Sequence, residues 1–274
     1  MIECPHPPLG ALRLYEAGTA GAATMVSDTE WQAWGEKDPY FGVLTEERYR
    51  KRMLTAEALE EFFRTGRRHI EEILAACRRH FGDISTQRSL DFGCGVGRTL
   101  IPLSEVSEVC VGVDIAGAML EEAARNCVKY NRHNVRLART LEEIDARTGG
   151  GFSFIHSHIV LQHLDPQRGL SIISALLSRL DAGGVAVLHM TYAHTKHRGN
   201  LGVRPRASRL ARFISRPLTR FRRHITNGDP QMLMHPYDMN RVLFLAQDCG
   251  VRGGGLQFTD HGGHLGVILF LRRE

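Results

Sequence analysis

The residues best suited to chemistry stand where an apolar run ends in an acid and then breaks into three alternating glycines. The run reads Leu90-Asp91-Phe92-Gly93-Cys94-Gly95-Val96-Gly97-Arg98-Thr99. In an open α/β sheet, a short strand that continues through glycines into a helix presents bare backbone N–H groups and a positive helix terminus to a ligand. The run therefore predicts a nucleotide or cofactor site.

Two cofactors compete for this loop, a dinucleotide and S-adenosylmethionine, because both folds place glycines after the first strand and an acid after the second. The spacing here is Gly93-x-Gly95-x-Gly97, whereas the dinucleotide fingerprint needs its third glycine where Arg98 stands. Asp91 directly before the glycines also favours S-adenosylmethionine, as does a hairpin at the end of the chain.

The elements that position this loop alternate between strand and helix. Short apolar runs predict strands at 89–92, 109–114, 135–138, 152–157, 185–190, 256–259 and 265–271. Helices are expected between them at 98–103 and 116–131, from Asp165-Pro166 onward, and at 236–248. The last two strands form a hairpin, so the pattern predicts an α/β fold with a mostly parallel seven-stranded sheet and one antiparallel strand.

The flanking segments complete the domain organisation. Residues 1–26, rich in Pro, Gly and Ala, predict a disordered arm, and a capping-box pattern at Ser27 marks the start of order. Residues 27–82 form an N-terminal helical cap, ending in a long amphipathic helix stopped by Gly82. The remaining residues, 83–274, form one domain with an insertion at about 192–234.

Four motifs in register resemble those of class I S-adenosylmethionine-dependent methyltransferases. They are the loop at 90–98, Val111-Gly112-Val113-Asp114-Ile115 with Met119-Leu120, the stretch 154–164, and Leu180-Asp181-Ala182-Gly183-Gly184. Together they cover residues 89–191 in the family's order and spacing. The resemblance implies a Rossmann-like fold, methyltransferase activity and S-adenosylmethionine as the cofactor.

The resemblance also implies which residues bind the cofactor. Asp114 would accept both ribose hydroxyls, a geometry that suits a carboxylate, and Asp91 would meet the methionine ammonium directly or through water. Ile115 and Met119 would flank the adenine or ribose, although core packing explains Met119 equally well. The further cofactor-binding candidates are Gly93, Cys94, Gly95, Gly97, Arg98, Ser157 and His158.

Adenine recognition departs from the family's pattern. The acid often found after the third strand is missing from Ala138-Arg139-Thr140-Leu141. Glu142 is the available substitute.

Histidines supply the candidates for catalysis, because an acceptor hydroxyl or ammonium must lose a proton during methyl transfer. His163 follows the fourth strand and is the first choice for a base or substrate contact; the alternative is a backbone hydrogen bond at the helix start. His261, in the terminal hairpin loop, is the second choice, against a solvent-exposed loop. The acid-rich cage of a metal-dependent enzyme cannot be assembled here, so no metal is predicted.

The amino-acid composition indicates the class of protein and the cellular compartment. The 274 residues are 43% hydrophobic and 24% charged, as in ordinary globular proteins, and no run approaches the roughly 18 apolar residues of a membrane helix. No secretory signal is recognisable, and the six cysteines form no Cys-x-x-Cys pair. Reduced thiols and a cytoplasmic location are expected.

The acceptor is the least determined part. The basic segment 196–223 fits a substrate lid, a peripheral membrane contact, a patch for an anionic partner, or a helix packed on its own domain. We expect methylation of a small-molecule hydroxyl, carboxyl or amine, with an anionic or lipid-linked acceptor as one option. The alternatives are a non-catalytic S-adenosylmethionine-binding scaffold and an RNA or protein methyltransferase. Base methylation of nucleic acid is disfavoured, because Ser157-His158-Ile159-Val160 lacks that class's Pro-Pro-aromatic motif.

Overall fold

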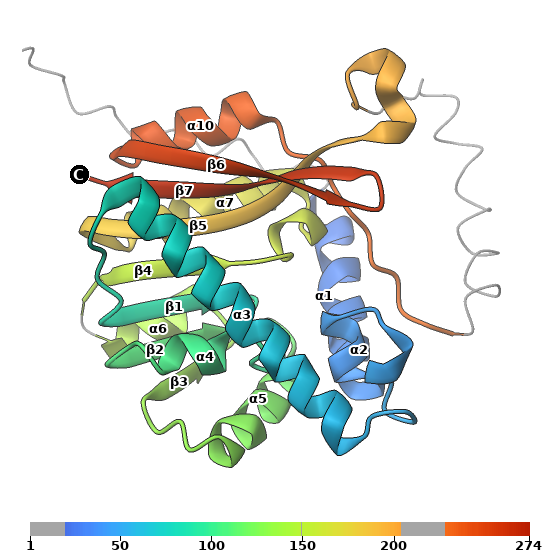
Figure 1. Ribbon diagram of the computed structural model, residues 1–274. Coiled ribbons are helices and arrows are strands. Elements are labelled where there is room, and N and C mark those ends of the chain that lie inside the picture. The colour runs from blue at the N-terminus through green and yellow to red at the C-terminus, as the bar shows by residue number, and fades with distance from the viewer. Residues whose placement is uncertain (1–19, 149, 204–227) are drawn as a thin grey trace, which may run out of the picture.

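A mixed β-sheet lies at the centre of the molecule (Figure 1). The computed structural model describes residues 20–148, 150–203 and 228–274, and within these ranges seven strands pair in the order β3-β2-β1-β4-β5-β7-β6. From β1 to β7 they span Arg88–Phe92, Val109–Val113, Val135–Ala138, Phe152–Ser157, Leu180–His194, Val251–His261 and His264–Arg273. Among these strands β7 alone runs in the direction opposite to all the others, so the predicted sheet with one antiparallel strand is confirmed.

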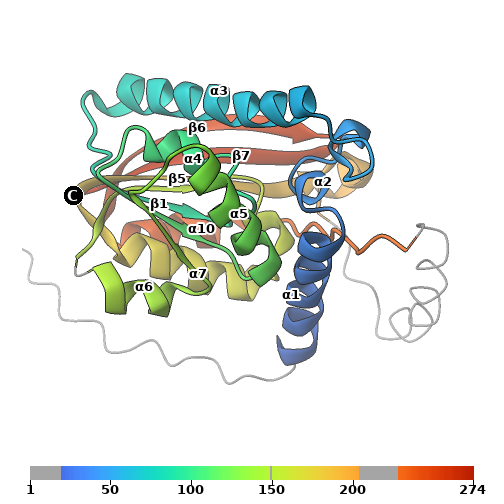
Figure 2. The same cartoon turned by 90° about the horizontal axis from the view of Figure 1, so that it is seen from below.

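Helices cover both faces of the sheet (Figure 2). On one face lie α3 (Ala56–Phe81), α4 (Leu100–Ser104) and α5 (Gly117–Lys129); on the other lie α6 (Leu141–Thr148), α7 (Pro166–Ser178) and α10 (Met239–Asp248). The N-terminal helices α1 (Ala20–Lys37) and α2 (Pro39–Val43) stand at the end of the sheet, with the short 3₁₀ turns η1 (Glu47–Tyr49), η2 (Leu161–His163) and η3 (Thr195–Asn200). This arrangement leaves the carboxyl ends of β1, β2 and β4 facing α1.

Local sequence signals explain several helix boundaries. The hydroxyl of Thr55 accepts a hydrogen bond from the N–H of Ala58 at 3.2 Å and caps α3, which ends where Gly82 adopts a φ of +73°. Asp165 accepts from the N–H of Gln167 at 3.0 Å and precedes Pro166, as predicted for α7.

Strand lengths differ from the predictions because neighbouring strands determine them. β5 begins at Leu180 rather than at residue 185, since Phe152 of β4 pairs with Leu180 across a register shift. β6 begins at Val251 rather than at residue 256, because it pairs along β7 as far as Arg273. The amino-acid composition of a strand does not indicate which residues of the neighbouring strands it pairs with.

Helix α1 begins at Ala20, ahead of the predicted start of order at Ser27. Residues 20–24 contain three alanines, and alanine has the highest intrinsic helix propensity. The part of the predicted arm before residue 20, and most of the basic segment 196–223, lie outside the described residues. Within the described ranges, no helix has the length and apolar character needed to cross a membrane.

An aromatic cluster joins the cap to the rest of the domain. Tyr40 packs edge-to-face on Phe62 with ring centroids 5.1 Å apart, and Tyr49 packs on the same ring at 5.3 Å. The Tyr40 hydroxyl donates to Glu122 at 2.6 Å and accepts from Asn126 at 3.0 Å, both on α5. Aromatic pairs of this geometry add to the stability gained from burial.

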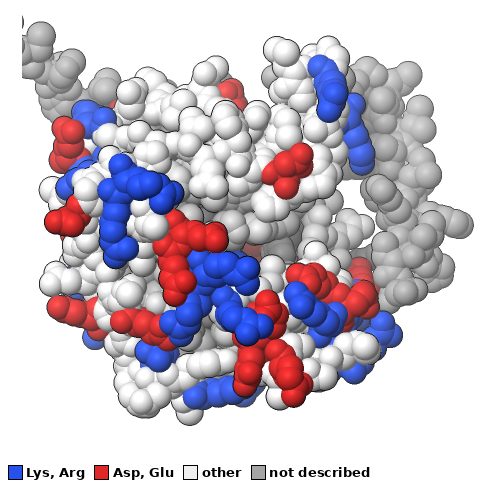
Figure 3. Space-filling model, viewed as in Figure 1, with Lys and Arg blue, Asp and Glu red and all other residues white. Residues whose placement is uncertain are grey.

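The exposed surface of α3 carries mixed charge. Basic and acidic side chains alternate over this face (Figure 3). Arg64 and Arg68 both lie within ion-pair distance of Glu61, and Arg67 pairs with Glu105. This surface lacks the single-sign field typical of a nucleic-acid site.

We expect Gly66→Ala to destabilise the protein by about 1–3 kcal/mol. A Cβ at Gly66, which lies within α3, would overlap the backbone carbonyl of Arg98, and backbone cannot move aside cheaply. Denaturant unfolding measures the loss. Gly199→Ala is the matched control because its Cβ would meet no atom within 4 Å. Equal stability of both variants would contradict the close contact between α3 and the glycine loop.

Candidate cofactor and acceptor site

The glycine loop forms at the carboxyl end of β1. Gly93, Gly95 and Gly97 have φ values of +75°, +51° and +92°, a region that residues with a Cβ rarely adopt. The N–H groups of Gly93 and Cys94 both donate to the carbonyl of Val113, at 2.7 and 3.0 Å. The loop therefore folds back onto the end of β2.

Asp114, the residue after β2, joins the loop to the start of α5. Its Oδ2 accepts from the N–H of Gly95 and its Oδ1 from the N–H of Ala116, each at 2.9 Å. Burial raises the pKa of Asp114 to about 6, against the opposing effect of these two hydrogen bonds. Each carboxylate oxygen has about two acceptor positions, so both oxygens keep capacity for a further donor.

Two adjoining cavities open beside the loop. The first has a volume of about 380 Å³ and extends from Asp114 and Ile115 past Leu141 and Glu142 to Arg168 on α7. The second has a volume of about 460 Å³ and lies between the glycine loop, the N-terminal helices and the hairpin. Its lining includes Cys94, Gly95, Arg98, Met119, His158, Gln162, Met232, Met234 and His261.

The two cavities share part of their walls. The residues common to both are Trp31, Gly93, Asp114, Ile159, Val160 and His163. One elongated ligand could therefore occupy parts of both, passing Gly93 and Asp114.

Most of the predicted site residues line one of these cavities. They are Gly93, Cys94, Gly95, Arg98, Asp114, Ile115, Met119, His158, His163 and His261; Glu142 also lines the first cavity. Gly97, in contrast, packs beside Ile101 and Ala123, and the Ser157 hydroxyl donates to the carbonyl of Phe92 at 3.0 Å. These two residues shape the loop and the sheet rather than the cavity walls.

The side chain of Asp91 lies beneath the loop with 1% of its surface exposed and lines neither cavity. One carboxylate oxygen accepts from the Thr99 hydroxyl at 2.7 Å and the other lies 2.8 Å from Nδ1 of His156. Asp91 therefore positions Thr99 and His156, and its contact with the cofactor ammonium, directly or through water, stays a prediction.

Arg98 is a buried cation on the wall of the second cavity, with 8% of its surface exposed. Its Nη1 lies 3.5 Å from the Thr65 hydroxyl, and its Nε has no hydrogen-bond partner in the described part of the chain. Burial lowers the pKa of Arg98, which reflects the cost of keeping its charge away from water. An anion entering the second cavity would offset that cost.

His163 presents a defined tautomer. Its Nδ1 lies 2.7 Å from the carbonyl of Leu233, so Nδ1 carries the proton and Nε2 carries the lone pair. Burial lowers the pKa of His163 to about 4, and the ring packs edge-on against Trp31 with centroids 5.0 Å apart. The backbone hydrogen bond considered from the sequence is therefore present, and the same side chain lines both cavities.

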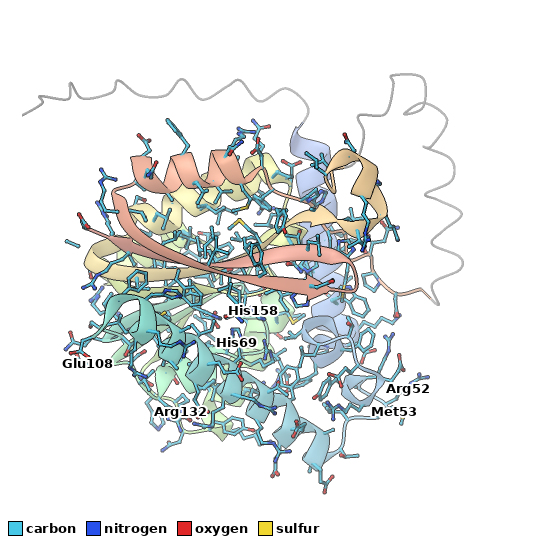
Figure 4. The ribbon with its side chains drawn as sticks, turned by 45° about the horizontal axis from the view of Figure 1, so that its top comes forward. Arg52, Met53, His69, Glu108, Arg132 and His158 are labelled. Atoms are coloured by element: carbon cyan, nitrogen blue, oxygen red, sulfur yellow. The ribbon has the colours of Figure 1, made fainter. Side chains whose placement is uncertain are left out.

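His261 reaches the second cavity from the end of β6, as part of a row of histidine rings. His261 packs against His189 with centroids 5.1 Å apart, and His189 lies 5.0 Å from His158. His158 stacks on His69 of α3 at 3.9 Å (Figure 4). Among the described residues no group of three His, Cys, Asp or Glu side chains has an arrangement suited to a metal ion.

Several lining residues were missed by sequence reasoning. Trp31 lies far in the sequence from Met232 and Met234, and none of the three belongs to a motif. Only the position of Trp31 in a predicted helical cap gave a signal, whereas the two methionines follow the basic segment without periodicity.

Comparisons with known proteins agree with this geometry. Residues 90–186 match a family described as a methyltransferase domain. Over 70 residues the chain is 39% identical to the aklanonic acid methyltransferase DauC of Streptomyces sp. (strain C5), a match covering 24% of this chain and 30% of that protein. Residues 90–186 therefore form a methyltransferase domain, which is the part of the chain that carries most of the predicted motifs.

Two solved structures of magnesium protoporphyrin IX methyltransferase (ChlM) from Synechocystis PCC 6803 share the fold of this methyltransferase. The one with bound S-adenosylmethionine is 16% identical with a TM-score of 0.53, covering 90% of this chain and 97% of that chain. The one with bound S-adenosylhomocysteine is 18% identical with a TM-score of 0.51, covering 78% and 87%. The predicted methyltransferase domain and Rossmann-like fold are confirmed, and the ligands bound in these two structures are the predicted cofactor and its demethylated product.

The family match ends at residue 186, before much of the second cavity's lining. Trp31 precedes the matched region, and Met232, Met234 and His261 follow it. Much of the side of the site opposite the glycine loop therefore lies outside the matched region.

We expect the affinity of this methyltransferase for S-adenosylhomocysteine to fall as the pH is lowered through about 6, the pKa of Asp114. Only the ionised carboxylate accepts both ribose hydroxyls, so protonation removes a favourable contact, and raising the pH above 6 brings no further gain. Calorimetric titrations should show a loss of about tenfold per pH unit below the pKa. Asp114→Asn should bind weakly without that step; the same step in this variant would assign it to another group.

Proposed function

We propose that the chain binds S-adenosylmethionine across both cavities and transfers its methyl group to an oxygen of a small-molecule acceptor. The observation that carries the proposal is the wall shared by the two cavities, where Gly93, Asp114 and His163 meet. The adenosine half would occupy the first cavity, with its ribose on Asp114 and its adenine between Ile115 and Leu141. The methionine half would then pass Gly93 into the second cavity.

Arg98 would hold the methionine carboxylate in this arrangement. It is a buried cation that directly follows the glycine loop and lines the second cavity, and a guanidinium pairs with a carboxylate through parallel hydrogen bonds. The pairing would leave the sulfonium near His163, on the wall that both cavities share.

The acceptor would enter the remaining part of the second cavity. Trp31, Met232 and Met234 give it an apolar and polarisable wall, which suits a flat organic molecule. The names of the related proteins support a small-molecule acceptor, since one acts on aklanonic acid and the other on magnesium protoporphyrin IX.

His163 would accept the proton of the acceptor hydroxyl. The acceptor oxygen attacks the methyl carbon, and the carbon–sulfur bond breaks with its electron pair moving to the positively charged sulfur. As the oxygen takes up the methyl group it becomes strongly acidic, so even a base with a pKa of about 4 can receive the proton. Nε2 is the atom that receives the proton, because the hydrogen bond from Nδ1 to the carbonyl of Leu233 leaves the lone pair on Nε2.

We also propose a cytoplasmic location, because five of the six cysteines lie in the described residues and all five carry free thiols. Persistent free thiols are typical of a reducing compartment.

Arg98→Met should weaken binding of S-adenosylhomocysteine by about tenfold to a hundredfold, the loss expected for a hydrogen-bonded charge pair. Methylthioadenosine lacks the amino-acid carboxylate, so its affinity should change little in the same variant. Calorimetry with both ligands makes the comparison. An equal loss for both would mean that Arg98 acts on the fold of the loop and not on the carboxylate.

His163→Ala should lower turnover by about a hundredfold, the usual contribution of a general base. Incubation with methyl-labelled S-adenosylmethionine and a metabolite extract first identifies an acceptor, and the labelled product then gives the rate. The affinity for S-adenosylhomocysteine should stay within about twofold. His133→Ala, an exposed site remote from both cavities, is the control. Near-normal turnover of His163→Ala would remove this side chain from the mechanism.

A further inference from the structure

Residues 228–238, which we call the strap, cross from the N-terminal helices to β5 beside the second cavity (Figure 1). Met232 and Met234 of the strap line that cavity. The carbonyl between them, on Leu233, accepts the hydrogen bond from Nδ1 of His163. The strap thus forms a wall of the part of the second cavity that the acceptor would enter, which we call the acceptor chamber. It also supplies the carbonyl that sets the tautomer of His163.

The C-terminal half of the strap is held by the sheet and by η2. The N–H of His235 donates to the carbonyl of Gln162 at 2.7 Å, and the N–H of Tyr237 donates to the carbonyl of Thr191 at 2.8 Å. The hydroxyl of Thr191 returns a bond to the carbonyl of His235 at 3.0 Å. These contacts do not involve the N-terminal helices.

The N-terminal half of the strap is held by ionic contacts with the cap. Arg50 donates from Nη2 and Nη1 to the two carboxylate oxygens of Asp229, at 2.7 and 3.2 Å. The ammonium of Lys37 donates to the same carboxylate at 2.6 Å. Next along the strap, the N–H of Gln231 donates to Glu30 of α1 at 2.8 Å.

Neighbouring side chains also hold the guanidinium of Arg50 in place. Its Nη1 also contacts Asp38 at 3.3 Å, and its guanidinium lies 3.5 Å from the ring centroid of Phe41. The side chains of Arg50 and Asp229 are only 14% and 21% exposed, unlike the mobile surface pairs that contribute little. A bidentate pair between partly buried groups has both strength and a fixed direction.

We propose that the pairing of Asp229 with Arg50 and Lys37 keeps the strap closed over the acceptor chamber, and that Asp229 is a positioning residue that acts on His163 through Leu233. Three residues separate Asp229 from Leu233, so once the carboxylate is released the bond from Gln231 to Glu30 is the remaining contact with α1 described for this part of the strap. Release would move Met232 away from the chamber and take the carbonyl of Leu233 away from Nδ1. The effect on methyl transfer rests on the proposed role of His163, whereas the closure itself does not.

Amide hydrogen exchange of Asp229→Asn tests the closure without any acceptor. The Gln231 amide should exchange about tenfold or more faster than in the native chain, because its bond to Glu30 depends on the closed strap. The Tyr237 amide, held by β5, should keep its protection. Asp229→Glu should restore the Gln231 protection in large part, and Glu61→Gln, which removes an ion pair on α3 away from the strap, should change neither amide.

Unchanged protection of Gln231 in Asp229→Asn would overturn the proposal. Equal loss of protection at Gln231 and Tyr237 would overturn it as well, since it would indicate general unfolding. High salt should speed the exchange of Gln231 in the native chain more than in Asp229→Asn, because the ionic contact is the part that salt screens.

A proton NMR titration of the His163 ring tests whether Asp229 acts on His163 through Leu233. Burial holds the pKa of His163 at about 4, and opening of the strap should hydrate the ring, so the pKa in Asp229→Asn should rise toward its ordinary value near 6.5. Asp229→Glu should return it toward 4. An unchanged pKa of His163 in Asp229→Asn would contradict the proposed effect of Asp229 on His163. If instead these measurements hold while His163→Ala retains turnover, the proposed function fails and the closure stands.

Discussion

The carboxyl end of β2 is the point on which the site depends. The carbonyl of Val113 and the carboxylate of Asp114 together accept three N–H groups of the glycine loop, from Gly93, Cys94 and Gly95. These bonds require the backbone to turn through left-handed conformations, which glycine adopts without steric cost. Without these hydrogen bonds the loop would not be held over the sheet, and the two cavities would lose the wall that they share.

A second set of contacts supports this loop from below. Asp91 joins Thr99, which precedes α4, to His156 near the carboxyl end of β4. His156 in turn lies 3.1 Å, nitrogen to nitrogen, from His69 on α3. Two strands and two helices are thereby joined through one buried carboxylate, so displacement of any of them would disturb the loop. Buried polar groups of this kind carry a high desolvation cost and are stable only when each has its partner.

Motifs with a fixed spacing allowed much of this arrangement to be predicted. The loop, Asp114 and the hairpin are local in sequence, and their geometry follows from glycine, strand and turn chemistry. The partner of Asp91 could not be predicted, because strand pairing sets it: His156 is its neighbour across β1 and β4, and no pattern within either strand fixes that register. The methionines of the strap could not be predicted for the same reason, since only tertiary contacts bring them to Trp31.

The wall shared by the two cavities has a thermodynamic consequence. Trp31 and His163 line both cavities, so a cofactor that spans them and an acceptor in the second would lie against the same side chains. In the proposed arrangement their binding free energies would then be coupled. By linkage such a coupling is reciprocal: whatever factor the cofactor adds to the affinity for the acceptor, the acceptor adds to the affinity for the cofactor.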